Sequence, residues 1–150
     1  MERALYNRGL AYIHQGRFER GKQDLFRLKE LSPDDNRVYM SLGIAEARLS
    51  NFDVSLRYFD QALELRKMPE AYFYRGVSKG MLNRHQEAIQ DYSRAIDLRA
   101  NYPEALFNRG VSYLNMNRFA DACLDLRKSH ELGFTQALEL IQGYCLNTGN

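Results

Sequence analysis

The sequence predicts an all-α protein built from tandem helical hairpins, and three observations lead to this fold class. Four glycines, each closing a similar stretch of sequence, recur 34, 33 and 34 residues apart: Gly9, Gly43, Gly76 and Gly110. Each period contains two apolar stretches with the three- and four-residue spacing of a helix. Prolines lie at or just before the start of the last three periods, at Pro33, Pro69 and Pro103. A period of this length is typical of stacked supersecondary units that share one core.

The expected elements follow the glycines along the chain. Four hairpins span approximately residues 2–35, 36–68, 69–102 and 103–134, and one further helix spans approximately 135–147, together forming a single domain over 1–150. In the third hairpin the first helix is marked by Ala71, Tyr72, Val77 and Leu82, and the second by Ala88, Ile89, Tyr92, Ala95, Ile96 and Leu98. The break between them falls near Asn83 and Arg84.

Small residues recur where the two helices of a hairpin should touch. Twelve residues after each glycine the chain has Gly21, Ser55, Ala88 and Ala122. Large residues take the complementary positions sixteen after each glycine: Leu25, Phe59, Tyr92 and Leu126. This alternation predicts closely packed helix pairs with a continuous apolar core.

A repeated charge pair predicts how each hairpin closes. Arginine precedes the glycine in three repeats and aspartate follows it by fifteen residues, giving Arg8 with Asp24, Arg75 with Asp91 and Arg109 with Asp125. The second repeat changes both positions together, to Leu42 and Tyr58. We therefore expect the two positions to touch, either as a guanidinium with a carboxylate or as two apolar groups. Because the pair recurs at the repeat period, we interpret it as structural and not catalytic.

These residues make the chain resemble the tetratricopeptide repeat family across residues 2–134. The shared pattern is a large residue, the glycine, an aromatic, spaced alanines and a closing proline. Departures are few: Glu46 and Lys79 replace the tyrosine that is kept as Tyr12 and Tyr113. The resemblance implies a right-handed superhelical solenoid whose concave surface is lined by the first helix of each hairpin.

That resemblance and the helical phase predict a groove that binds protein. The residues three before and one after each glycine are apolar in all four repeats, and polar-tipped residues two before the glycine flank them. The predicted groove contains Tyr6, Leu10, Met40, Ile44, Phe73, Tyr74, Val77, Phe107, Asn108 and Val111, with Asn7 and Ser41 on its polar margin. The alternative is that this apolar ladder is core, because an apolar helix position is usually buried against its neighbour.

The expected partner is a helix or extended peptide of another protein with apolar anchors. The alternative is a structural role, as a segment of a longer array or as a self-associating, homodimeric solenoid. Because the first repeat starts at Met1, we expect further repeats, another domain or a second copy to precede it. Family members that hold acidic chaperone tails use lysine, asparagine and arginine, and the corresponding places here carry Tyr6, Leu10, Ser41, Glu70 and Tyr74, or Met40, Ile44, Tyr74, Glu104 and Asn108. No carboxylate clamp is therefore expected.

The C-terminal helix is expected to cap the array, with Ala137, Leu138, Ile141 and Tyr144 facing it. Cys123 and Cys145 lie in elements that should pack together, so they form either a disulfide or two reduced, buried apolar groups. The end of the chain resembles bacterial family members, some of which are exported. The compartment stays open between the cytoplasm and a bacterial periplasm.

Composition and motifs limit the function class. The net charge of +2 comes from 21 basic and 19 acidic residues scattered along the chain, which is unlike a nucleic-acid-binding protein. No apolar stretch approaches the roughly 20 residues of a membrane span. The three histidines do not share a turn with cysteines or carboxylates, and no phosphate-binding glycine loop is present. We expect no enzyme activity, no catalytic or metal-binding residues and no cofactor.

Overall fold

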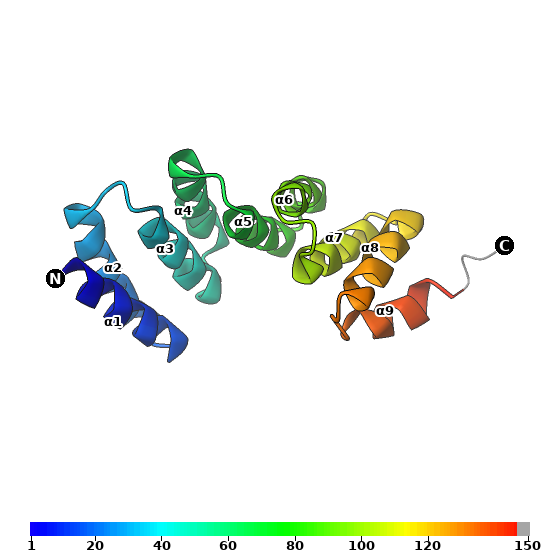
Figure 1. The fold of residues 1–150 in the computed structure, drawn as a ribbon, viewed down its shortest axis with the longest axis horizontal. Coiled ribbons are helices and arrows are strands. Elements are labelled where there is room, and N and C mark those ends of the chain that lie inside the picture. Colours follow the sequence, from blue (N-terminus) through cyan, green and yellow to red (C-terminus); the bar gives the residue numbers. More distant parts are fainter. Residues whose placement is uncertain (147–150) are drawn as a thin grey trace. The chain divides into compact units, whose positions relative to one another are not determined.

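The structure is a computed structural model that describes residues 1–146. In this range it contains α-helices α1 to α9 and no strand, which confirms the all-α prediction. The chain divides into two compact units, Met1–Lys67 and Met68–Asn150. Each unit is described by itself below, with the helices labelled as in Figure 1.

The first unit consists of two helical hairpins. Its helices are α1 (Glu2–His14), α2 (Phe18–Leu31), α3 (Asn36–Arg48) and α4 (Phe52–Leu65). Helix α1 packs on α2 and α3 packs on α4, while α2 also contacts α3 and joins the two hairpins (Figure 1). The first helices of the two hairpins, α1 and α3, touch as well.

The second unit repeats this arrangement and adds one helix. Its helices are α5 (Pro69–Met81), α6 (His85–Leu98), α7 (Pro103–Asn115), α8 (Phe119–Glu131) and α9 (Ala137–Tyr144). Pro69 and Pro103 each occupy the first helical position, where a missing amide donor costs nothing. Helix α6 packs on both α5 and α7, α7 packs on α8, and α9 packs on α8.

The anchor glycines allow large core side chains of the second helix to approach the first. A Cβ atom added at Gly43 would lie 2.6 Å from the ring of Phe59, which is fully buried. The same atom at Gly76 would lie 2.8 Å from the ring of Tyr92. The predicted pairing of small and large residues across each hairpin is therefore confirmed at these two positions.

Each hairpin turns seven residues after its anchor glycine through a left-handed residue. These residues have φ between 58° and 73° and are Gly16, Ser50, Asn83 and Asn117. Glycine and asparagine adopt this conformation readily, whereas serine does so less easily. The second hairpin therefore has the least favourable turn residue of the four.

The predicted charge pairs close three of the hairpins. Each arginine donates from Nε and Nη2 to both oxygens of its aspartate over 2.6–2.9 Å, in the pairs Arg8–Asp24, Arg75–Asp91 and Arg109–Asp125. The hydrogen bonds from Arg8 hold the pKa of Asp24 below its usual value. In the second hairpin Leu42 is buried and Tyr58 packs against the same cluster. Three hairpins therefore have the predicted charge pair, and in the second hairpin both positions belong to one apolar cluster.

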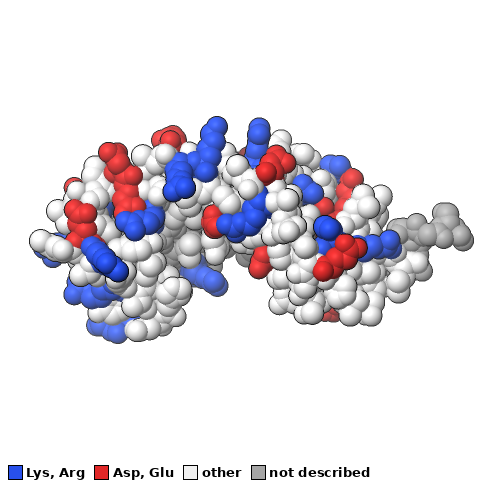
Figure 2. All heavy atoms as spheres, viewed as in Figure 1, with Lys and Arg blue, Asp and Glu red and all other residues white. Residues whose placement is uncertain are grey.

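Two charged partners were not expected from the sequence. Lys79 Nζ lies 2.8 Å from Asp91 Oδ2, so this carboxylate receives two cations. In the first unit Lys22 Nζ lies 2.8 Å from Glu46 Oε1, in a pair that joins α2 to α3 and is almost fully shielded from water. Figure 2 shows basic and acidic side chains interspersed on both units, as their scattered distribution in the sequence predicts.

The C-terminal helix is shorter than expected, and part of its predicted inner face is wrong. Helix α9 covers Ala137–Tyr144, and residue 147, its predicted end, lies outside the described residues. Ala137 is buried, Ile141 packs against the core and the half-exposed Tyr144 stacks on Phe119 of α8, as expected for the inner face, but Leu138 is 43% exposed. Leu140 takes the inward place that we expected for Leu138.

Candidate protein-binding face

In the first unit the predicted groove residues come from two helices that touch, α1 and α3. Tyr6 and Leu10 belong to α1, and Met40 and Ile44 belong to α3. Tyr6, Leu10 and Ile44 are half-buried, whereas Met40 is buried. Met40 therefore contributes to packing more than to the accessible surface. The alternative interpretation expected such burial for every apolar residue of the predicted groove.

A pocket of about 280 Å³ lies beside Tyr6 in this unit. Its lining comes from the starts of α1 and α3 and from α2: Glu2, Arg3, Tyr6, Asn7, Leu28, Asp35 and Arg37. The guanidinium of Arg37 lies 4.9 Å from the centroid of the Tyr6 ring, within cation–π range. Asp35 orients that guanidinium, accepting hydrogen bonds from Arg37 Nε at 2.9 Å and Nη2 at 2.7 Å.

Asp35 also begins α3. Its carboxylate accepts a hydrogen bond of 3.0 Å from the backbone N–H of Arg37, which is the usual role of an N-cap aspartate. The hydrogen bonds from the Arg37 side chain, aided by this backbone bond, hold the pKa of Asp35 below its usual value although partial burial opposes them. The pocket therefore keeps a carboxylate and a guanidinium at its margin over the whole neutral range.

In the second unit the predicted residues come from α5 and α7, which also touch. All six are half-buried: Phe73, Tyr74, Val77, Phe107, Asn108 and Val111. This exposure leaves part of each side chain accessible on the surface of the unit. We call these six residues the apolar face; in the first unit Tyr6, Leu10 and Ile44 occupy the equivalent positions of the repeat.

The aromatic members of the apolar face are partly covered by the hairpin or loop that follows. The ring of Phe73 lies 5.1 Å from that of Tyr102, just before α7, and Phe107 lies 4.9 Å from Phe134, after α8. These spacings suit tilted aromatic pairs. Phe73 and Phe107 therefore contribute both to packing and to the surface. Substitutions there would disturb the fold, so the aliphatic residues are better sites for testing binding.

Sequence reasoning missed these covering residues, although a signal was present. Asp35, Met68 and Tyr102 each lie eight residues before an anchor glycine, and each is the N-cap of a first helix. Within the second unit, Tyr102 of this column covers Phe73 of the preceding repeat.

The polar margin differs in part from the prediction. Asn7 is exposed as expected, but Ser41 is buried. The amide of Asn108 donates 2.8 Å to the carbonyl of Glu104 one turn earlier, and Tyr74 packs edge-on against Phe73 with ring centroids 5.2 Å apart. The margin is therefore narrower than the sequence suggested.

An ion pair flanks the face at the start of α5. Arg99 Nη2 donates to Glu70 Oε1, and its guanidinium lies 4.8 Å from the centroid of the Tyr102 ring. The hydrogen bond to Glu70 raises the pKa of Arg99, while burial raises the pKa of the Tyr102 phenol. Both side chains keep their neutral-pH charge states, so this flank is a fixed ion pair beside a neutral phenol.

A larger hollow of about 720 Å³ in the second unit lies apart from the predicted residues, none of which lines it. Arg75, Lys79 and Asp91 contribute to its wall, and both cations are already paired with the Asp91 carboxylate. Among residues 1–146 there is no group of three or more metal-ligating side chains placed to hold an ion. Within the same range no helix is both long and apolar enough to cross a membrane.

Comparisons with known proteins agree with this geometry. A family model described as tetratricopeptide repeat matches residues 2–35, and one described as TPR repeat matches residues 80–117. No curated protein matches the chain in sequence.

Several solved structures are similar to the chain. MamA 41-end from Desulfovibrio magneticus RS-1 has a TM-score of 0.82 at 15% identity, covering 95% of this chain and 92% of its own. A structure titled MamA AMB-1 has a TM-score of 0.75 at 26% identity, covering 95% and 78%. The first TPR of Spaghetti (RPAP3), bound to the HSP90 peptide SRMEEVD, has a TM-score of 0.75 at 23% identity, covering 77% and 93%.

Proposed function

The chain belongs to the tetratricopeptide repeat family, and we propose that it is a protein-interaction module whose apolar face binds a segment of another protein. The observation that carries the proposal is the set of aliphatic residues directly after the anchor glycines. Leu10, Ile44, Val77 and Val111 are all apolar and all half-buried on the first helices. Partly exposed apolar residues that recur at the repeat period are typical of an interaction surface.

The chemistry of the face favours apolar anchors on the partner. A helix would present them every three or four residues and an extended peptide every two, and either can supply apolar anchors for Val77 and Val111. The solved neighbour that holds the peptide SRMEEVD supports peptide binding by this fold. An acidic peptide is a poor match for this chain, because Glu70 and Glu104 stand where a clamp would need cations or amides.

Affinity capture from source-cell lysate tests the proposal. The bait is the unmodified chain, compared with Val77→Glu and Val111→Glu and with the control Gln86→Glu, an exposed site on α6. The valines are preferred to Phe73 because Phe73 packs on Tyr102. We expect one protein that the unmodified chain and Gln86→Glu retain and that both valine variants lose.

Equal retention by all four baits would contradict the proposal. Sedimentation of the same proteins separates it from self-association. A dimer that both valine variants abolish would mean that a second copy, and not another protein, occupies the apolar face.

A further inference from the structure

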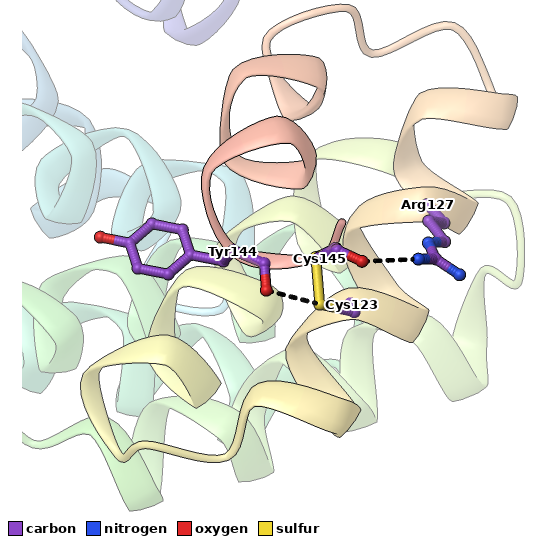
Figure 3. Close-up of a disulfide and its surroundings, with 4 residues drawn as sticks. All are labelled: Cys123, Arg127, Tyr144 and Cys145. Carbon is purple, nitrogen blue, oxygen red and sulfur yellow. Dashed lines mark hydrogen bonds between the residues drawn. A yellow bond between two sulfur atoms is a disulfide. The ribbon is translucent and has the colours of Figure 1, made fainter. Parts of the chain in front are cut away.

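A disulfide fastens the last described helix to the second unit. Cys123 of α8 and Cys145, the residue that ends α9, are joined across a sequence separation of 22 residues (Figure 3). Of the two alternatives for these cysteines, the structure therefore has the disulfide and not two reduced thiols. Both cysteines are buried. Because a disulfide sulfur carries no proton, the 3.9 Å approach of Cys123 Sγ to the Tyr144 carbonyl oxygen is a van der Waals contact.

Helix α9 shares its core with one end of the apolar face. Ala137, Leu140 and Ile141 of this segment pack in the cluster that contains Cys123 and Leu126. Phe107, a member of the apolar face, and Leu114 pack against the same cluster from α7. The helix therefore covers apolar surface that continues from Phe107 into the unit.

Without the disulfide, α9 would be held by the apolar contacts of Ala137, Leu140 and Ile141 and by the stacking of the Tyr144 ring on Phe119 of α8. It has eight residues, and isolated helices shorter than about 12 residues are marginal in water. Only Ala137 among its residues is buried. Arg127 Nη2 also donates a hydrogen bond of 3.0 Å to the carbonyl oxygen of Cys145, drawn in Figure 3.

We propose that α9 is a redox-controlled cover for the α7 end of the apolar face. The disulfide keeps the cover closed, and reduction by a dithiol releases it and exposes Phe107, Leu114 and Leu126. This inference rests on the proposed function, because the surface it regulates is part of the apolar face. In the oxidised protein α9 covers the α7 end of the apolar face. In the reduced protein a partner segment binds there in place of α9.

The reduction is a two-step exchange. A thiolate of the dithiol attacks one sulfur, forming a mixed disulfide and freeing the other cysteine as a thiolate that takes up a proton. The second thiol of the reagent then displaces the remaining cysteine, so the reagent leaves as a cyclic disulfide and Cys123 and Cys145 are both thiols. Because both sulfurs are buried, attack requires α9 to open locally, and reduction is expected to be slow in the folded protein.

The size of the effect follows from loop closure. For a loop of about 22 residues, the chain-entropy model assigns the cross-link a bias on the order of 10²-fold toward the closed state. Reduction should therefore raise the open population of α9 by about that factor. Helix α9 packs on α8 and not on α5 or α6, so these two helices should keep their stability.

Hydrogen exchange of the whole chain tests the proposal, with and without dithiothreitol. We expect the α9 amides to exchange on the order of 10²-fold faster in the reduced protein, while α5 and α6 are unchanged. The variant with both Cys123→Ser and Cys145→Ser should show the same pattern without reductant. Emission of the apolar dye 1-anilinonaphthalene-8-sulfonate should rise in both cases, because the surface under α9 becomes accessible.

Unchanged protection of α9 after reduction would overturn the proposal, as would loss of protection in all helices of the second unit. An unchanged dye signal with faster exchange in α9 would also overturn it, since no apolar surface would then be uncovered. None of these readouts uses a partner, so their failure is distinct from failure of the capture experiment.

Discussion

Replacing Asp91 with alanine is the most informative test of how the hairpins are held together. The Asp91 carboxylate is 4% exposed and accepts hydrogen bonds from Arg75 Nε at 2.9 Å and Nη2 at 2.6 Å. Lys79 Nζ lies 2.8 Å from the same group. The substitution therefore removes three charge-assisted contacts and leaves two cations in a half-buried seam.

The magnitude can be bounded from these contacts. Removing one partner of a buried ion pair costs about 3 to 5 kcal/mol when the remaining charge stays dry. Here the Arg75 side chain is 20% exposed, so water can reach part of the stranded guanidinium. We therefore expect Asp91→Ala to lower the free energy of unfolding by about 3 kcal/mol, near the lower end of that range.

The first hairpin provides a matched control. Asp24 has the same bidentate geometry, but its partner Arg8 is 60% exposed and can regain water when the carboxylate is removed. Asp24→Ala should therefore cost clearly less than Asp91→Ala. Urea unfolding followed by far-ultraviolet circular dichroism measures both. A loss below about 1 kcal/mol for Asp91→Ala, or equal losses at the two sites, would refute the reasoning.

The second hairpin suggests a rescue. Copying its apolar pair by combining Arg75→Leu with Asp91→Tyr restores packing but leaves Lys79 without the carboxylate. Adding Lys79→Met removes that last charge. We expect the triple variant to recover all but about 1 kcal/mol of the loss, and the double variant to recover less.

Two further predictions concern stability. Gly43→Ala should lower the free energy of unfolding by about 1 to 3 kcal/mol, because the new methyl group meets the Phe59 ring. Gly80→Ala should raise it by about 0.5 kcal/mol, because the new methyl group lies 3.7 Å from its nearest neighbour, the Tyr92 hydroxyl. Thermal melts measure both changes. Arg37 lowers the pKa of Asp35, so this pair stabilises the fold above about pH 4 and the contribution is lost as pH falls. Asp35→Asn should therefore lower stability at neutral pH and leave it unchanged at about pH 2, and a similar loss at both would contradict the assignment.

The repeating parts of the fold could be predicted because each position was sampled four times. The Arg75–Asp91 contact, for example, followed from the same pair in two other repeats and from its joint replacement by Leu42 and Tyr58. Periodicity fixes the phase of a helix even where one residue is ambiguous. That is why the helix pairs and the small and large positions between them were predicted correctly.

Features that occur once could not be predicted in this way. Helix α9 has no second copy, and its short apolar run Ala137–Ile141 allows more than one phase, so Leu138 was placed inward where Leu140 packs. Glu46 was noted as a departure from the repeat pattern. Its partner Lys22 lies in the preceding repeat, where no periodic column marks it.

The candidate face was predictable in outline only. Helical phase identified residues such as Val77 and Val111, which are half-buried as a binding surface requires. It did not predict that Tyr102 covers Phe73, because that contact depends on where the following helix begins. Burial of Met40 and Ser41 likewise depends on packing that one helix does not specify.

Site-specific photo-crosslinking in the source cell tests the central claim most directly. A benzophenone amino acid is placed at Val77 on the apolar face and, as the control, at Gln86 on α6. We expect a discrete adduct with a second, different protein from position 77 and none from position 86. No adduct at position 77, or the same adducts from both positions, would contradict the claim that the apolar face is the binding site.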